Sequence, residues 1–378
     1  MNLNAYHVLF GIVLILGIVY DLLKKNVIQI KNRKIKISNV ILAVAGICLI
    51  LFSGLVGDIT SDHSQYIYIY NNIKLHSFKS FFQLTRKIEG VEAGYGLLLW
   101  IIGNTVDNEV LIFIVSSTLV IVPIILFAKK TKDPFLFLIL FLGFGYYFAS
   151  FNVIRQTIVA SLFLLTFNFI KEGKYGKYFF SIVLISLFQI TALFMLVFYK
   201  LLRQKKNVKT ILKNIIIVLI GILGMNHLIN FFDILWFHGK YSQYRVVAGN
   251  IKNIIIPIFL FLLFYILKSL GVRKKISNKQ CLKKKRNTKY NNVDISDIIY
   301  NASIYWLAFW IMFVKFSYLE RLTYFFIPLV LFGIVEIICN YKNNKKRRII
   351  KICVICIVCL YYFKFGQYPN LYKLYFIK

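Results

Sequence analysis

Long apolar blocks separated by short basic stretches constrain this chain more than any other feature. Blocks such as residues 41–56, 110–128, 254–267 and 322–339 carry at most one charged residue each. A bilayer crossing needs about 20 apolar residues, and every backbone polar group must be satisfied within the lipid, which favours helices. The short segments of alternating polarity typical of a membrane β-barrel do not occur. The sequence therefore predicts an all-α polytopic membrane protein.

The net charge of +33 is explained by membrane topology. Basic residues gather between the apolar blocks, chiefly in residues 24–36, 268–289 and 342–351. Cytoplasmic loops are enriched in Lys and Arg, so we expect these stretches to be cytoplasmic. Nucleic acid would require a folded basic face with aromatic platforms, and no soluble segment is present to carry one. We therefore expect the lipid bilayer, and not nucleic acid, as a partner.

Successive spans must cross the membrane in alternate directions, with the basic stretches inside. On this basis the sequence predicts about ten full spans and two partial elements, or 10–12 transmembrane helices, in one membrane domain over residues 1–378. Both termini are expected outside the cell. External loops are expected at about residues 57–92, 232–250 and 315–321. Residues 95–102 are apolar but too short to cross alone, so they predict a partial or re-entrant helix.

The apolar block at residues 178–202 has basic residues on both sides. A single span would leave the second basic group outside, against the positive-inside rule. A helical hairpin broken near residues 189–191 would keep both groups inside. We favour the hairpin.

A Cys-x2-Cys-x2-Cys run, formed by Cys353, Cys356 and Cys359, has the spacing of some metal ligands. It lies within an apolar helical pattern at residues 352–363, where small thiols pack well. We therefore interpret these cysteines as packing residues and expect neither a metal nor a cofactor.

Carboxylates follow the second span in two groups. Asp58 and Asp62 are four residues apart, so they share a face if the segment is helical. Glu92 precedes two glycines and an apolar helix. Such carboxylates can act as a general base or bind sugar hydroxyls. A solvated loop and an ordinary helix start, where acids suit the dipole, remain the alternatives.

Two of the predicted spans begin with an arginine at the external face. Arg155 and Arg321 are therefore placed where the positive-inside rule disfavours them. A guanidinium suits bidentate binding of phosphate. Snorkelling of Arg155, or a surface pair between Arg321 and Glu320, remains an equal alternative. Neighbouring polar or cationic candidates on this face are Asn152, Gln156, Arg245 and Tyr324.

Arginines, carboxylates and aromatic residues thus share one predicted face. This suggests a substrate with an anionic pyrophosphate head at the membrane and a polar sugar body above it. Aromatic rings can stack on sugar rings, and the candidates are Tyr66, Tyr95, Trp236 and Tyr244.

Five short motifs, in order over about residues 57–330, resemble those of the EpsG-type Wzy polysaccharide polymerases. They are Asp62-His-Ser-Gln-Tyr66, Glu92-Ala-Gly-Tyr-Gly, Asn152-Val-Ile-Arg155-Gln156-Thr-Ile-Val-Ala160, Leu187-Phe-Gln189-Ile-Thr-Ala192-Leu and Arg321-Leu-Thr-Tyr324-Phe. The chain departs from the family pattern in three places. Gln189 stands where the family has His, Ala93 stands where Pro is usual, and no Arg sits just ahead of Asp58.

The resemblance implies a metal-independent C-type glycosyltransferase architecture with external loops forming the active site. Such polymerases join oligosaccharide repeat units carried on undecaprenyl pyrophosphate, at the outer face of the bacterial cytoplasmic membrane, beside chain-length regulators and other assembly proteins. Arg155 and Arg321 would hold the pyrophosphate, and Asp62, Asp58 or Glu92 would act as base. The implied substrate-binding residues are Gln156, Asn152, Tyr66, Tyr95, Gln189, Arg245 and Tyr324.

Two other functions fit the same features. A C-type glycosyltransferase using a polyprenyl-phosphate sugar would place a catalytic Asp in the first external loop, where Asp58 and Asp62 lie. A lipid-linked oligosaccharide flippase would favour charges lining a cavity from both leaflets, whereas the notable charges of this chain gather at one predicted face. A membrane O-acyltransferase fits less well, because no intramembrane His stands in a polar motif.

Overall fold

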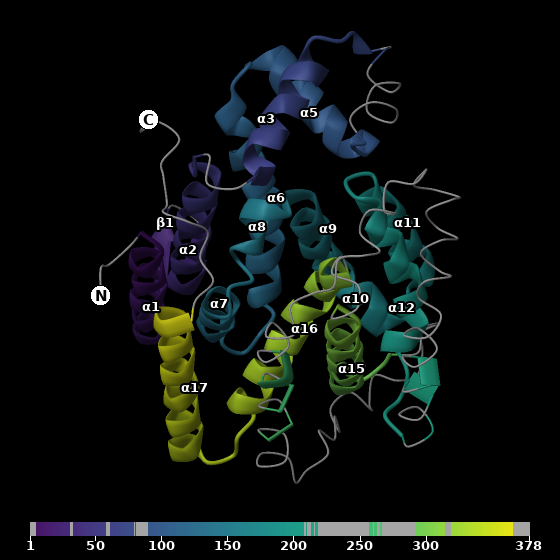
Figure 1. The fold of residues 1–378 in the computed structure, drawn as a ribbon. Helices are drawn as coiled ribbons and strands as arrows, with labels where there is room; N and C mark the ends of the chain where they lie inside the picture. Colours follow the sequence, from purple (N-terminus) through teal and green to yellow (C-terminus); the bar gives the residue numbers. More distant parts are fainter. Residues whose placement is uncertain are drawn as a thin grey trace. The chain divides into compact units, whose positions relative to one another are not determined.

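In the computed structural model the chain divides into two compact units. Figure 1 labels their helices and strands. Unit 1 comprises Met1–Thr166, Phe179–Phe194 and Asn343–Lys378, and unit 2 comprises Phe167–Tyr178 and Met195–Lys342. The residues that the structure describes, apart from short pieces within 209–266, are 5–30, 33–57, 61–78, 80, 90–207, 292–313 and 319–365.

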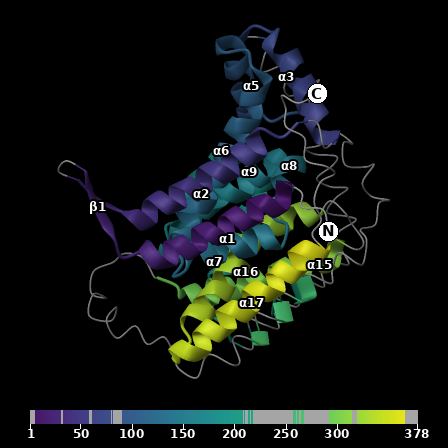
Figure 2. The ribbon, with the colours of Figure 1, turned by 90° about the vertical axis from the view of Figure 1, so that its left-hand side faces the viewer.

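Apolar helices form the body of unit 1 (Figure 2). Helix α2 packs against α1 and α6, and α6 packs in turn against α9. Helix α6 lacks charge beyond its first residue, and the Asn108 side chain caps its start by accepting from Val110 N at 2.9 Å. The bounds of these helices are Ala5–Leu23 for α1, Ile37–Gly54 for α2, Glu109–Ala128 for α6 and Ile154–Phe163 for α9.

A two-stranded antiparallel hairpin joins α1 to α2. Its strands are β1, Val27–Ile30, and β2, Arg33–Lys36, with Val27 opposite Lys36. We predicted residues 24–36 as a basic cytoplasmic loop, without strands. In β1, Ile28 and Ile30 alternate with Gln29, a pattern typical of a β-strand.

A short apolar helix does form at the segment that we predicted as a partial helix. Helix α5 runs over Ala93–Thr105 and packs along α3, which runs over Ser61–Lys74. The two helices lie side by side in Figures 1 and 2. Asp107, with φ 45°, joins the pair by accepting from Tyr70 Oη at 2.9 Å and from Lys74 Nζ at 2.8 Å.

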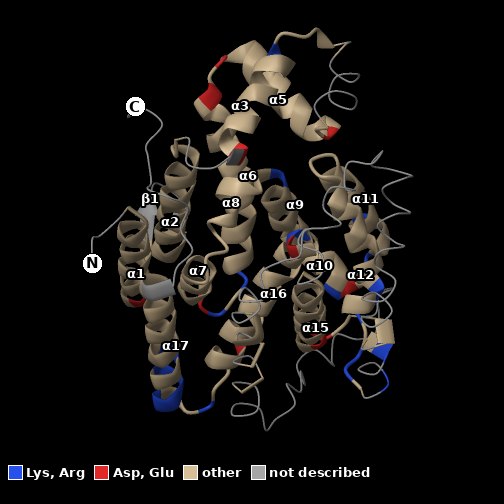
Figure 3. Cartoon of the chain, in the orientation of Figure 1, with Lys and Arg blue, Asp and Glu red and all other residues tan. Residues whose placement is uncertain are grey.

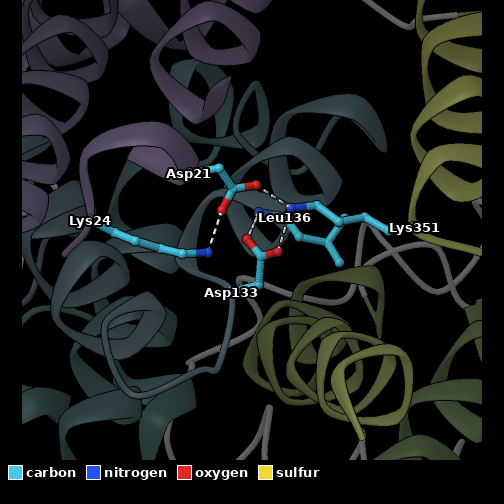
Figure 4. Close-up of polar contacts among 5 residues, drawn as sticks. All are labelled: Asp21, Lys24, Asp133, Leu136 and Lys351. Atoms are coloured by element: carbon cyan, nitrogen blue, oxygen red, sulfur yellow. Dashed lines mark hydrogen bonds and ion pairs between the residues drawn. The ribbon is translucent and has the colours of Figure 1, made fainter. Parts of the chain in front are cut away.

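The two ends of the chain are joined within unit 1. Helix α17, Asn344–Phe365, begins with a cluster of basic residues and packs on α7, Pro134–Gly143 (Figure 3). Lys351 Nζ lies 2.8 Å from Asp21 Oδ2 in α1 and 2.6 Å from Asp133 Oδ2 (Figure 4). Asp133 also caps α7 by accepting from Leu136 N. One lysine therefore connects the first helix, α7 and the last described helix.

Unit 2 is built on a helix pair. Helices α15, Ile295–Phe313, and α16, Glu320–Cys339, pack against each other, and α12, Met195–Leu202, packs on α15. Rings of Tyr305, Phe309 and Phe326 surround Phe198 of α12. The other short elements among the described residues are α8, Ala149–Asn152; η1, Leu164–Thr166; α10, Phe167–Glu172; α11, Tyr175–Ser186; and η2, Ile190–Phe194.

The predicted break within residues 178–202 is confirmed. Helix α11 ends at Ser186, and helical structure resumes with η2 at Ile190. Near the start of α11, the Tyr178 hydroxyl donates to the Met195 carbonyl, and the ring centroids of Tyr178 and Tyr199 lie 4.9 Å apart. The chain therefore folds back on itself as a helical hairpin.

Six helices of the described residues are long and apolar enough to cross a membrane, namely Ala5–Leu23, Ile37–Gly54, Glu109–Ala128, Ile154–Glu172, Ile295–Phe313 and Glu320–Cys339. The prediction of an all-α polytopic membrane protein is confirmed. The predicted total of 10–12 spans also counts segments such as 215–231, which lie mostly outside the described residues, and stays a prediction.

Candidate functional site

A charged pair inside unit 1 forms the centre of the candidate site. Arg155 stands at the start of α9, where Val153 breaks the backbone between α8 and α9. Its guanidinium forms an ion pair with the Glu92 carboxylate, and its side chain is 18% exposed. The same nitrogen, Nη1, lies 3.4 Å from the Gly90 carbonyl. The helix break thus places a cation, largely shielded from solvent, at the end of an apolar helix.

Glu92 is held by two partners. One carboxylate oxygen, Oε2, accepts from Arg155, and the other, Oε1, accepts from the Ile190 backbone N–H at 3.2 Å. Glu92 immediately precedes α5, yet its side chain does not cap that helix. Its carboxylate is therefore committed to Arg155 and to the break in the 178–202 segment.

The backbone of that break is fastened to the start of α5. Gly94 N donates to the Leu187 carbonyl at 2.7 Å. A Cβ on Gly94 would lie 2.8 Å from Leu187 Cβ, so glycine is required for this close approach. Next to it, the Thr191 hydroxyl donates to Gln156 Oε1 at 2.7 Å. Three separate chain segments thus converge on Arg155 and Glu92.

Aromatic side chains from α3 and α5 pack beside the pair. The rings of Tyr66 and Tyr95 meet edge to face with centroids 5.6 Å apart. Tyr66 lies within hydrogen-bonding reach of the Arg155 guanidinium. The Tyr95 hydroxyl lies 3.3 Å from Ser116 Oγ, and its side chain is fully buried. We therefore assign Tyr95 a role in supporting Tyr66, because a buried ring has no face for a sugar.

The structure brings five of the predicted residues together: Arg155, Glu92, Tyr66, Tyr95 and Gln156. Asp62 lies one helical turn before Tyr66 in α3. Gln189 is buried at the break between α11 and η2, whereas Asn152 is exposed at the end of α8. Asp58 and Arg245 lie outside the described residues, as do the sugar-stacking candidates Trp236 and Tyr244.

The second predicted arginine belongs to unit 2. Arg321 is the second residue of α16, and the Tyr324 hydroxyl donates to Glu320 Oε1 at 3.0 Å on the adjacent turn. Glu320 and Tyr324 therefore form a small polar group of their own beside Arg321.

Three residues in or beside the site were not among the predicted site residues. Thr191 and the Ile190 amide come from the break in the 178–202 segment, and both stand next to the predicted Gln189. His63, stacked on Phe113 with centroids 3.9 Å apart, is buried next to Asp62. The signal for Thr191 was its place in an otherwise apolar stretch, where a polar side chain needs a partner.

Among the described residues, no group of three or more His, Cys, Asp or Glu side chains is placed to hold a metal ion. The cysteine run lies on α17, where Cys353 and Cys356 are exposed.

Comparison with protein-family models matches residues 39–375 to the EpsG family. The chain belongs to the EpsG family. The match covers nearly the whole chain and agrees with the resemblance seen in the short motifs. Searches of curated proteins and of solved structures found no match. EpsG membership suggests a glycosyltransferase-like, polysaccharide-polymerase-type function, and the apolar helices suggest a multi-pass membrane protein.

Proposed function

We propose that this EpsG-family protein joins oligosaccharide repeat units carried on undecaprenyl pyrophosphate, at the outer face of the bacterial cytoplasmic membrane. The observation that carries the proposal is Arg155, a largely shielded guanidinium at the mouth of an apolar helix, ringed by Glu92 and Tyr66. A lipid-linked diphosphate presents its anionic head at the depth where such a helix mouth lies.

The chemistry required is a glycosyl transfer. A hydroxyl oxygen of the incoming lipid-linked unit bonds to the anomeric carbon of the growing chain. The bond from that carbon to the phosphate oxygen breaks, and the electron pair leaves with the polyprenyl diphosphate. The hydroxyl proton passes to a carboxylate, for which Asp62, Asp58 and Glu92 are the candidates.

Arg155 suits the developing charge on the leaving diphosphate. A guanidinium binds phosphate oxygens through directed hydrogen bonds, and these strengthen as negative charge grows on the leaving group. The site's low exposure reduces competition from water. In this proposal Gln156, Asn152 and Gln189 of unit 1 contact the substrate, and the roles that the resemblance gives to Arg321, Arg245 and Tyr324 stay predictions from the sequence. Tyr66 is buried beside the guanidinium and helps to hold it in position.

The proposal involves no metal ion, no nucleotide sugar and no cofactor. The donor already carries its leaving group, so the energy for bond formation comes from release of the diphosphate. Its protein partners would be a chain-length regulator and other membrane proteins of polysaccharide assembly.

The test is deletion of the gene in its host, followed by complementation and analysis of surface polysaccharide on gels. We expect the deletion to leave single repeat units and the wild-type gene to restore the ladder. Arg155→Ala should fail to restore it at equal protein level. Arg348→Ala, which removes an exposed arginine from α17, is the matched control and should restore it.

Loss of single repeat units from the surface would contradict the proposal, because it would point to a flippase or an earlier glycosyltransferase. A full ladder from Arg155→Ala would show that this arginine does not hold the diphosphate.

A further inference from the structure

The candidate anion site already contains an anion of the protein's own. Glu92 Oε2 accepts from Arg155, and both side chains are mostly shielded, at 19% and 18% exposed. A carboxylate and a phosphate offer a guanidinium the same kind of charged oxygen acceptor. Both therefore compete for the same donor atoms of Arg155.

The guanidinium is not saturated by the contact with Glu92. Its Nη1 serves both Glu92 and the Gly90 carbonyl, whereas its Nε is buried and donates to no described residue. A buried N–H without an acceptor is costly. An incoming diphosphate can satisfy this donor as well as replace Glu92, because it carries several oxygens.

Glu92 also has a second hydrogen-bond partner, which it keeps when a diphosphate binds Arg155. Its Oε1 accepts from the Ile190 N–H, and the hydrogen bond from Gly94 N to the Leu187 carbonyl fixes the backbone two residues away. Displacement from Arg155 thus leaves the carboxylate hydrogen-bonded to the break of the 178–202 segment.

We propose that Glu92 is a resident counter-anion of Arg155 that the diphosphate of the substrate displaces on binding and that competes the diphosphate product off the site. This inference rests on the proposed function for the identity of the ligand. It assigns Glu92 a regulatory place at the site, since its charge weakens diphosphate binding and promotes product release.

Competition between Glu92 and the diphosphate for Arg155 predicts that a mutation at this binding site strengthens diphosphate binding. Glu92→Gln keeps the size of the side chain and an oxygen for the Ile190 N–H, but removes the charge that occupies Arg155. Binding of a diphosphate should therefore tighten about tenfold, a change equivalent to about 1.4 kcal/mol. A purely structural role of the pair predicts the opposite, because a loosened Arg155 would bind less well.

The experiment measures binding of inorganic pyrophosphate to the detergent-purified full chain by isothermal titration calorimetry. Glu92→Gln should bind about tenfold more tightly than wild type. The matched control is Glu172→Gln, which removes a carboxylate paired with Lys174 in unit 2 and should bind like wild type. Adding Arg155→Gln to Glu92→Gln should abolish the gain.

Equal or weaker pyrophosphate binding by folded Glu92→Gln would overturn the inference. Should that variant fail to fold, Glu92→Asp serves instead, because its shorter side chain keeps the charge but withdraws it from Arg155, and it should also bind more tightly. Tighter binding together with failed complementation by wild type would refute the polymerase function while leaving the counter-anion intact. Complementation by wild type without tighter pyrophosphate binding by Glu92→Gln would support the polymerase function and refute the counter-anion role of Glu92.

Discussion

Replacing Gly94 with Ala tests whether the close approach of α5 to the break at Leu187 holds the candidate site in shape. The added Cβ would lie 2.8 Å from the Leu187 Cβ and carbonyl oxygen, about 0.6 Å short of ordinary van der Waals contact at 3.4 Å. Backbone atoms contribute to this clash, so no rotation of a side chain relieves it. One of the two segments must shift.

The size of the effect follows from two opposing contributions. Overpacking of this kind costs about 1–3 kcal/mol. The gain in helix propensity of Ala over Gly is up to about 1 kcal/mol. We therefore expect Gly94→Ala to lower the free energy of unfolding by about 1–2 kcal/mol.

The effect on activity should be larger than the effect on stability. Gly94 lies two residues from Glu92, and the Ile190 N–H that holds Glu92 belongs to the segment that must move. Displacement of a reacting geometry by about 1 Å can cost about 100-fold in rate. A shift of about 0.6 Å should therefore reduce polymer formation by about tenfold or more.

The assay combines the melting temperature of the purified protein with the polysaccharide ladder of the complemented deletion strain. Gly176→Ala is the matched control, because a Cβ there meets no atom within 4 Å. It should leave the ladder intact and stability equal or slightly raised. The reasoning would be refuted if Gly94→Ala were as stable as Gly176→Ala and gave a full ladder.

Three further outcomes are expected. Lys351→Met should lower the free energy of unfolding in detergent by about 2 kcal/mol, because it removes the cation paired with Asp133, whose side chain is 11% exposed. Thermal or chemical denaturation measures this, and an unchanged stability would contradict it. The hydrogen bond from Lys74 lowers the pKa of Asp107, so its stabilisation is present above about pH 4 and is lost as pH falls through that lowered pKa. Asp107→Asn should thus melt earlier than wild type at pH 7, with the difference closing in acid; a constant difference would count against the pair. Arg155→Lys should restore less than about a tenth of the wild-type ladder, because an ammonium lacks the guanidinium fork; full restoration would show that charge alone suffices.

Hydrophobic patterning was enough to predict the membrane helices. Segments such as α2 and α6 are long and nearly uncharged, and the lipid leaves them no alternative to a helix. The break near residue 189 was predictable because basic residues flank the segment on both sides. The hairpin of β1 and β2 was missed, since four-residue strands within a basic stretch produce only a weak periodic signal.

Sequence motifs identified most members of the candidate site but not their arrangement. Arg155 stood out as a charge at a disfavoured position, whereas nothing local indicated that Glu92, 63 residues earlier, pairs with it. The role of the Ile190 amide was equally hidden, because a backbone N–H has no signature in the sequence. Such contacts depend on how distant segments pack together.

Reconstitution of the purified protein in lipid vesicles would measure the joining of repeat units without other proteins of the host. Lipid-linked repeat units extracted from the deletion strain would be supplied to proteoliposomes, and the products would be separated by size. The account predicts a ladder of polymers from wild type, with release of polyprenyl diphosphate, and no ladder from Arg155→Ala. Repeat units that stay single with correctly folded wild-type protein, or that merely cross the bilayer, would contradict it.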